Sequence, residues 1–212
     1  MKDLSNFREE YNQGELWEAQ MHDNPLQQFS SWMQEAIASE IPEPNAMILA
    51  TALRDGSPSA RIVLLKEVTS NGFVFFTNYE SRKGKEIADN PHVALVFPWH
   101  PMERQVRVEG RVEKIPAEES DAYFNSRPET SKLGAWTSPQ SKVLHSRDEL
   151  DHIQQENERK FFGKPIHRPP YWGGHLIIPH LIEFWQGRPN RLHDRILYLK
   201  SGENWEIRRL AP

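Results

Sequence analysis

Three side chains that carry or can carry positive charge stand at alternate positions in the stretch RPNRLHDRILYL. They are Arg191, His193 and Arg195, and the apolar residues that follow predict a strand. Alternate side chains of an extended chain share one face, so the three groups would lie side by side. Such groups repel one another unless an anionic or electron-rich ligand lies there. The stretch is therefore a candidate ligand face, and the alternative is a solvated strand edge with Asp194 as ionic partner.

The segment TNYESRKGKEIADN is a candidate phosphate site. A strand ends near Thr77, and Ser81 is a residue type that caps a following helix. Arg82 and Lys83 would then occupy the first helical turn, where the helix dipole disfavours cations. An anion bound at the helix N-terminus would explain the basic side chains. The alternative is a solvated surface helix.

Two further stretches carry groups that bind anions. In RIVLLK, Arg61 and Lys66 stand at the two ends of an apolar strand and differ in parity, so a regular strand directs them to opposite faces. In AYFNSRPETS, Tyr123 and Arg127 are four residues apart on one helix face, and Ser131 follows in a loop. A phenol, a guanidinium and a hydroxyl form a clamp for an oxyanion. The alternatives are strand ends that reach water and an exposed helix end.

Amide side chains suit the donor and acceptor edge of a heteroaromatic ring. Gln105 lies on the polar face of the alternating stretch ERQVRVEG, and Gln140 and Ser141 follow in WTSPQSK. Trp185, in EFWQG, is a ring contact or an ordinary core residue. On the other face of ERQVRVEGRV, the pattern predicts buried Val106, Val108 and Val112. The sequence has no P-loop, no G-x-G-x-x-G, no G-x-S-x-G and no defensible zinc motif.

Hydrophobic periodicity and turn residues predict the elements that position these groups. Residues 1–24 form an arm, and residues 25–212 form a single domain. An amphipathic helix is expected over 25–40, and further helices over 80–90, 117–127 and 146–163. Strands are expected over 46–53, 59–68, 72–79, 92–99, 104–115, 175–187, 195–200 and 205–210. Short strands joined by tight turns predict an antiparallel barrel.

Composition narrows the class of protein. The 212 residues carry a net charge of −4, so no global basic field attracts nucleic acid. Hydrophobic residues make up 37%, a lean core that suggests completion by a partner subunit. The absence of cysteine excludes disulfides and thiolate sites. A charged N-terminal stretch and the lack of an apolar run of about 20 residues lead us to expect a cytoplasmic protein.

The motifs in this order resemble those of the pyridoxine/pyridoxamine 5′-phosphate oxidase family. The resemblance runs from about Phe7 to Pro212 and is carried by RIVLLK, FFTNYESRKGKEI, FPWHPMERQVRVEG, YFNSRPETSKLGAW, SPQS, IEFWQGRPNRLHDR and IRRLAP. It implies a mainly β fold with α, the FMN-binding split β-barrel, antiparallel and of Greek-key type, with peripheral helices. It also implies a homodimer with FMN at the subunit interface.

The resemblance implies a role for each group of candidates. The FMN phosphate and the chain beside it would be held by Arg61, Ile62, Val63, Leu64, Lys66, Phe76, Thr77, Ser81, Arg82 and Lys83. The flavin ring and ribityl chain would be surrounded by Gln105, Gln140, Ser141, Trp185 and Arg195. The substrate would be bound by Arg8, Tyr11, Lys66, Tyr123, Arg127, Ser131, Arg191 and His193, with Arg191 and His193 over its ring as the catalytic residues. Two positions depart from the family pattern: Glu9, where a second basic residue is common, and Phe76, where tyrosine is frequent.

The implied reaction oxidises pyridoxine or pyridoxamine 5′-phosphate at C4′ to pyridoxal 5′-phosphate. A hydride passes to the flavin, and O₂ is reduced to H₂O₂. One alternative is a flavin reductase or a deazaflavin-dependent reductase on the same barrel, which would need no second phosphate clamp. Another is a non-catalytic carrier of FMN or pyridoxal phosphate. A nucleic-acid-binding barrel is disfavoured by the net charge.

Overall fold

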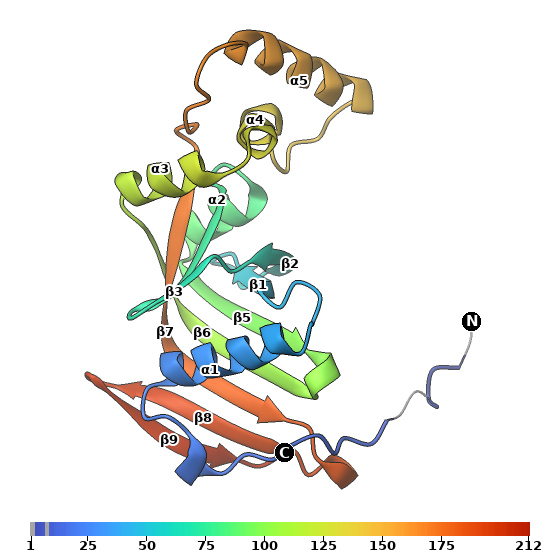
Figure 1. Ribbon diagram of the computed structural model, residues 1–212, viewed down its shortest axis with the longest axis vertical. Coiled ribbons are helices and arrows are strands. Elements are labelled where there is room, and N and C mark those ends of the chain that lie inside the picture. The colour runs from blue at the N-terminus through green and yellow to red at the C-terminus, as the bar shows by residue number, and fades with distance from the viewer. Residues whose placement is uncertain (1–2, 7–8) are drawn as a thin grey trace.

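The computed structural model describes residues 3–6 and 9–212, and Figure 1 shows its strands with helices at the periphery. The strands are β1 (Ala46–Ala52), β2 (Pro58–Leu64), β3 (Glu67–Thr69), β4 (Gly72–Asn78), β5 (His92–Trp99), β6 (Arg104–Lys114), β7 (Trp172–Gln186), β8 (Asp194–Ser201) and β9 (Asn204–Leu210). The α-helices are α1 (Pro25–Ala38), α2 (Arg82–Asp89), α3 (Ala117–Ser126), α4 (Glu129–Thr137) and α5 (Arg147–Phe161). Short 3₁₀ turns are η1 (Glu18–Gln20), η2 (His100–Met102) and η3 (Pro189–Arg191).

All strand pairs among the described residues are antiparallel, and together they make one curled sheet. The order is β2-β1-β5-β6-β7-β4-β3, with β8 pairing β7 and β9 pairing β8. The long strand β7 pairs with β6 from His175 to Gln186, while β4 pairs its first half and β8 its second half. The sheet therefore divides at β7, as Figure 1 shows, which is the geometry of a split barrel.

A β-bulge in β7 interrupts the regular pairing with β6, and His180 is its extra residue. The register between β6 and β7 shifts between Glu109 and Gly110. A Cβ at Gly110 would lie 2.5 Å from the carbonyl oxygen of Ile178, so only glycine allows the two backbones to approach this closely.

The core lies between α1 and the inner face of the sheet. The amphipathic helix begins at Pro25, capped by the Asn24 side chain, and buries Phe29 and Trp32. The Phe29 ring lies 4.9 Å from that of Phe73 and 4.7 Å from that of Phe97, in edge-on contacts. The predicted inward residues Val106, Val108 and Val112 are buried, which confirms the alternation.

Three local predictions are wrong. The strand expected over 59–68 is two strands, because the chain crosses over after Leu64: the Leu65 amide donates to Asn45, whereas the Lys66 amide donates to Val74. Ser131 lies in helix α4, not in a loop. Arg191 has a left-handed backbone, φ 62°, within η3, and β8 begins only at Asp194, so Arg191 and His193 precede the strand that holds Arg195.

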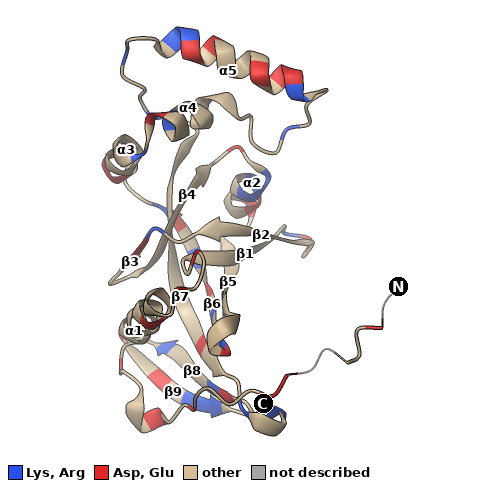
Figure 2. Cartoon of the chain, turned by 45° about the vertical axis from the view of Figure 1, so that its right-hand side comes forward, with Lys and Arg blue, Asp and Glu red and all other residues tan. Residues whose placement is uncertain are grey.

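Across the described residues, no helix is both long enough and apolar enough to cross a membrane. Figure 2 shows that acidic and basic residues are interspersed on the chain, with both signs along α5.

Candidate active site

A cavity of about 720 Å³ collects four basic side chains from four parts of the chain. Arg61 comes from β2, Lys66 from the β2–β3 connection, Lys83 from α2 and Arg127 from the end of α3. None of the described residues that line it is acidic. We call this the cationic cavity. Arg61 and Lys66 line it together, so the expectation that they face opposite sides is wrong, because the strand ends between them.

Arg61 is held in place by a buried carboxylate, Glu86 of α2. The Arg61 Nη2 atom lies 2.9 Å from Glu86 Oε2, and the side chain of Glu86 is 5% exposed. Thr51 and Ser59 donate hydroxyl hydrogen bonds to the same oxygen. Burial alone would raise the pKa of Glu86, but hydrogen bonds from two hydroxyls and two guanidinium groups outweigh it and lower the pKa to about 2.

Arg82 is turned toward this carboxylate and does not line the cavity. Its Nε atom lies 2.8 Å from Glu86 Oε1 one helical turn away, and its side chain is 69% exposed. Ser81 caps α2 as predicted, accepting from the Gly84 amide, but its own hydroxyl donates to the Asn78 carbonyl and the side chain is fully buried. Ser81 therefore caps the N-terminus of α2, while the side chain of Lys83 reaches the cavity.

Lys83 connects α2 to the segment after α4. Its ammonium donates to Thr77 Oγ1 at 3.3 Å and to Gln140 Oε1 at 3.1 Å. Burial, followed by repulsion from Arg61, lowers the pKa of Lys83. An anion in the cavity would relieve both effects. Ile62, Val63, Leu64, Phe76, Thr77 and Gln140 also line the cavity, whereas Ser141 is exposed and does not.

The three residues of the predicted clamp lie together, at the end of α3 and in α4. Tyr123, Arg127 and Ser131 all line the cationic cavity. Tyr123 stacks on Phe76, with ring centroids 3.8 Å apart, and the Arg127 guanidinium lies over the Trp172 ring at 4.6 Å. Arg127 Nη1 is buried without a hydrogen-bond partner among the described residues, and burial lowers the pKa of this side chain. A buried, unpaired guanidinium nitrogen is costly unless an acceptor binds it.

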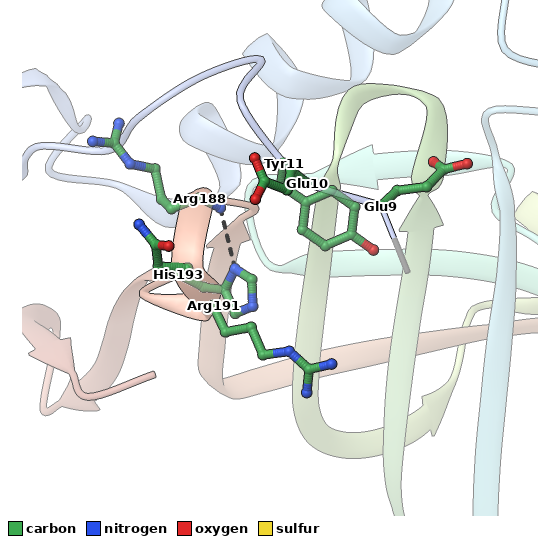
Figure 3. A pocket seen from close by; sticks show the side chains of 7 residues that line it. Glu9, Glu10, Tyr11, Arg188, Arg191 and His193 are labelled. Carbon is green, nitrogen blue, oxygen red and sulfur yellow. Dashed lines mark hydrogen bonds between the residues drawn. The ribbon is translucent and has the colours of Figure 1, made fainter. Parts of the chain in front are cut away.

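A second pocket, of about 590 Å³, lies between the N-terminal arm and the turn before β8 (Figure 3). It is lined by Glu9, Glu10, Tyr11, Arg188, Asn190, Arg191 and His193, and we call it the arm pocket. The Tyr11 ring packs 5.8 Å from that of His193 and 5.9 Å from that of Trp185. Arg8 lies outside the described residues.

His193 has one ring nitrogen committed to the backbone. Its Nδ1 atom accepts a hydrogen bond from the Arg188 amide at 3.1 Å, so a neutral ring carries its proton on Nε2 (Figure 3). Burial, followed by the charge of Arg191, lowers the pKa of His193. The imidazole is therefore neutral near pH 7, and its ring centroid lies 4.7 Å from that of Trp185.

Gln105, Trp185 and Arg195 form one row across three strands. Gln105 pairs with Trp185 in the β6–β7 register, and Trp185 pairs with Arg195 in the β7–β8 register, so their side chains share a face. The adjacent row on the opposite face, Val106, Phe184 and Ile196, is fully buried in the core. The first row is partly exposed and open to a ligand.

The cationic cavity and the arm pocket share no residue among those described. In Figure 1, α3 and α4 lie toward one end of the molecule, and η3 and the arm toward the other. The residues expected to bind one substrate molecule are thus divided between two places on a single chain.

Sequence reasoning missed the two carboxylates that hold the arginines. Glu86 lies in the motif FFTNYESRKGKEI and Glu183 in IEFWQGRPNRLHDR, but neither is among the predicted site residues. The one available signal was an acidic residue at a position where the sequence pattern predicts a buried or ligand-facing side chain. Which arginine each carboxylate binds is decided by tertiary contacts.

Known proteins with similar sequences decide the family. The family described as Pyridoxamine 5′-phosphate oxidase matches residues 33–153, and the Pyridoxine 5′-phosphate oxidase C-terminal dimerisation region matches residues 172–212. The chain belongs to the pyridoxamine 5′-phosphate oxidase family. The predicted family is confirmed.

Relatives in this family match along nearly the whole chain. A protein of Actinobacillus pleuropneumoniae serotype 5b (strain L20) is 56% identical over 212 residues, covering 99% of this chain and 100% of the relative. One of Cyanothece sp. (strain PCC 7425 / ATCC 29141) is 54% identical over 209 residues, covering 99% and 98%. Both are named pyridoxine/pyridoxamine 5′-phosphate oxidase.

Solved structures confirm the fold. PhzG from Burkholderia lata 383, in complex with tetrahydrophenazine-1-carboxylic acid, is 28% identical, with a TM-score of 0.87 over 93% of this chain and 98% of that one. A pyridoxamine 5′-phosphate oxidase-related, FMN binding protein from Nostoc punctiforme PCC 73102 has a TM-score of 0.71 at 16% identity, covering 91% and 100%. The predicted split barrel with peripheral helices is confirmed.

Proposed function

We propose that this chain is an FMN-dependent oxidase that converts pyridoxine and pyridoxamine 5′-phosphates to pyridoxal 5′-phosphate. The alcohol and O₂ give the aldehyde and H₂O₂, and the amine consumes one water as well and releases ammonia. The observation that carries the proposal is the cationic cavity, where four basic side chains converge without an acidic neighbour among the described lining residues. A chain of net charge −4 has little reason to assemble them except to bind anions.

The residues present fit two phosphate groups. Arg61 and Lys83, beside the N-terminus of α2, suit the phosphate of FMN. Arg127, with its unpaired buried Nη1, suits a second phosphate together with Lys66, Tyr123 and Ser131. Arg82 and Ser81 would then support the first phosphate indirectly, through Glu86 and through the helix cap. We retain Ser141 as a contact of the ribityl chain.

The row Gln105–Trp185–Arg195 would contact the flavin, together with Gln140. An amide, an indole and a guanidinium supply hydrogen-bond donors and a flat apolar surface. When bound, FMN supplies the chemistry that the protein lacks: it accepts a hydride from the C4′ carbon and is reoxidised by O₂. The chain's contribution is to hold the two reactants in contact and to exclude water.

Arg191 and His193 would lie over the substrate ring. Arg191 supplies a fixed positive charge, and neutral His193 presents an Nε2 proton that can be donated to a pyridine substituent. Tyr11 of the arm packs on His193 and would cover the substrate, with Arg8 as an expected further contact. Arg191 and His193 would therefore align the substrate, and neither would accept the hydride.

A homodimer would unite the two halves of the site. The cationic cavity and the arm pocket lie apart on one chain, and the match to a dimerisation region covers β7, β8 and β9. We propose that FMN binds at the subunit interface, where one chain supplies the phosphate-binding residues and its partner supplies Arg191 and His193. A cytoplasmic location is proposed because a chain without cysteine suits a reducing compartment.

The visible absorption spectrum of the purified protein tests the proposal. We expect a yellow protein that bleaches when pyridoxine 5′-phosphate is added without oxygen, and that regains its colour with air while forming pyridoxal 5′-phosphate. A yellow protein that does not bleach would favour a reductase or a carrier. A colourless protein that takes up no FMN would contradict the cofactor assignment.

A further inference from the structure

A buried carboxylate, Glu183, lies beneath the row expected to contact the flavin. Its side chain is 4% exposed, although it stands on the ligand-facing side of β7, two residues before Trp185. In the strand register Glu183 pairs with Arg107 on β6, and Arg195 is the diagonal neighbour on β8. A carboxylate buried in a sheet costs free energy unless it is fully paired, so its presence requires an explanation.

Both oxygens of this carboxylate are used by arginines. Arg195 donates from Nε to Oε1 at 2.8 Å and from Nη2 to Oε2 at 3.1 Å, a two-point contact that fixes the plane of the guanidinium. Arg107 donates from Nη1 to Oε2 at 2.9 Å. The hydrogen bonds from Arg195 to Glu183 raise the pKa of Arg195.

The Arg195 guanidinium is anchored at a third point. Its Nη1 donates to the carbonyl of Ala211 at 3.0 Å. Three of the five N–H groups of Arg195 are thus committed within the chain, and one on each terminal nitrogen remains for a ligand. Arg107 has a weaker hold on the same carboxylate, and its other contact is a 3.5 Å approach to Glu109.

We propose that Glu183 is a positioning residue that presents Arg195 to FMN in a single orientation. The inference rests on the proposed function and extends it to a residue that touches no ligand. Without the carboxylate, the guanidinium groups of Arg195 and Arg107 would repel each other, and the Ala211 carbonyl would be the one remaining described contact that orients Arg195. Glu183 would therefore act on the cofactor only through Arg195.

Titration of the FMN-free full-length chain with FMN, followed by quenching of flavin fluorescence, tests this. Compared with the unchanged chain, we expect Glu183→Ala to weaken FMN binding about tenfold or more, since two charge-assisted hydrogen bonds to Arg195 are lost. The FMN affinity of Glu183→Gln should lie between those of the unchanged chain and of Glu183→Ala, because an amide oxygen can still accept a hydrogen bond from Arg195 Nε. The matched control is Arg107→Ala, which leaves both Arg195 bonds in place and should stay within about twofold of the unchanged chain.

A double-mutant cycle separates positioning from a general structural effect. If Glu183 acts through Arg195, the variant carrying both Glu183→Ala and Arg195→Ala should bind FMN no more weakly than Arg195→Ala alone. Multiplied losses in the double variant, or unchanged affinity in both Glu183 variants, would overturn the proposal. If Glu183→Ala does not fold, the same cycle is run with Glu183→Gln. Absence of FMN binding by the unchanged chain would instead contradict the proposed function, and this inference with it.

Discussion

Buried carboxylates determine how the arginines of this chain are presented. Glu86 accepts from Arg61 and Arg82, and Glu183 accepts from Arg195 and Arg107. In each pair one arginine faces the proposed site while the other is more exposed to solvent. The strand or helix that carries each arginine could be predicted from the sequence, but the carboxylate that binds it could not. These carboxylates come from segments at least 12 residues away, except for the one-turn pair within α2.

At the scale of the residue, His193 should titrate below its ordinary pKa of 6.5. Burial and then the charge of Arg191 disfavour the imidazolium, so the folded chain binds fewer protons here than the unfolded chain. The contribution of His193 to the free energy of unfolding is therefore present above pH 6.5 and lost as the pH falls below 6.5 and through the lower pKa of the folded chain. An NMR titration of the histidine ring protons, with His193→Asn for assignment, should give a midpoint below 6.5.

Arg191→Ala is the informative partner for that titration. Removing the neighbouring charge while leaving the burial should move the His193 midpoint upward, toward 6.5. A midpoint that stays in place would mean that Arg191 does not act on the ring electrostatically. From the sequence we expected Arg191 and His193 to lie side by side on an extended strand. The left-handed backbone at Asn190 and Arg191 instead turns both side chains into the arm pocket.

At the scale of the element, most strands and helices could be predicted because their periodicity is local. Helix α4 could not, since the stretch ETSKLGAWT has a glycine and two threonines and little amphipathic pattern. Its placement depends on tertiary contacts such as the hydrogen bond from Trp136 Nε1 to the His167 carbonyl, 2.7 Å long. The break after Leu64 was hidden for a related reason, because the apolar run continues while the pairing partner changes.

Gly110→Ala should destabilise the pairing of β6 with β7 beside the β-bulge. The added Cβ would lie 2.5 Å from a backbone oxygen of β7 that cannot move without breaking the pairing, and overpacking of this kind costs about 1–3 kcal/mol. The control is Gly134→Ala in α4, where an added Cβ meets nothing within 4 Å and should stabilise the helix by up to about 1 kcal/mol. Chemical denaturation of both variants measures the difference; equal stabilities would contradict the bulge argument.

Arg209 of β9 fastens the arm to the barrel. It donates to both Glu18 oxygens, to Asp194 at 2.7 Å and to the carbonyl of Leu16 at 2.7 Å. In Arg209→Ala these partly exposed contacts, which together contribute roughly 1 kcal/mol, are lost. The fraction of molecules whose arm is detached from the barrel should therefore rise about fivefold. Limited proteolysis of the arm should accelerate accordingly. Arg208→Ala, which loses only an exposed pair with Glu206, should be cleaved at the unchanged rate; equal acceleration would show that the contacts of Arg209 are not the fastening.

At the scale of the whole molecule, the lean hydrophobic content predicted a partner subunit. The sequence could not reveal that the candidate residues fall into two separate pockets. That division arises because the first half of β7 pairs with β4 and the second half with β8. The family resemblance placed them around two ligands, FMN and the substrate, with FMN at the subunit interface. The assignment remains a proposal, and the dimer is the arrangement that reconciles it with the two pockets.

Subunit complementation tests this arrangement. Arg127→Ala and Arg191→Ala should each abolish most of the activity when every chain carries the change. Chains mixed during refolding form mixed dimers in which one site receives both changes and the other receives neither. At random association, roughly a quarter of the unchanged activity should return. If both residues of a site come from the same chain, mixing will restore nothing.

The anchoring of Arg195 by the Ala211 carbonyl has a practical consequence for handling the protein. A segment joined after Pro212 would begin two residues beyond Ala211, whose carbonyl holds the Arg195 guanidinium. We therefore expect an affinity tag joined after Pro212 to disturb this contact, so that kinetics measured on such a fusion would mix the properties of chain and tag. The exposed turn at Asp55 and Gly56, where an added Cβ on Gly56 meets nothing within 4 Å, offers room for a label with less interference.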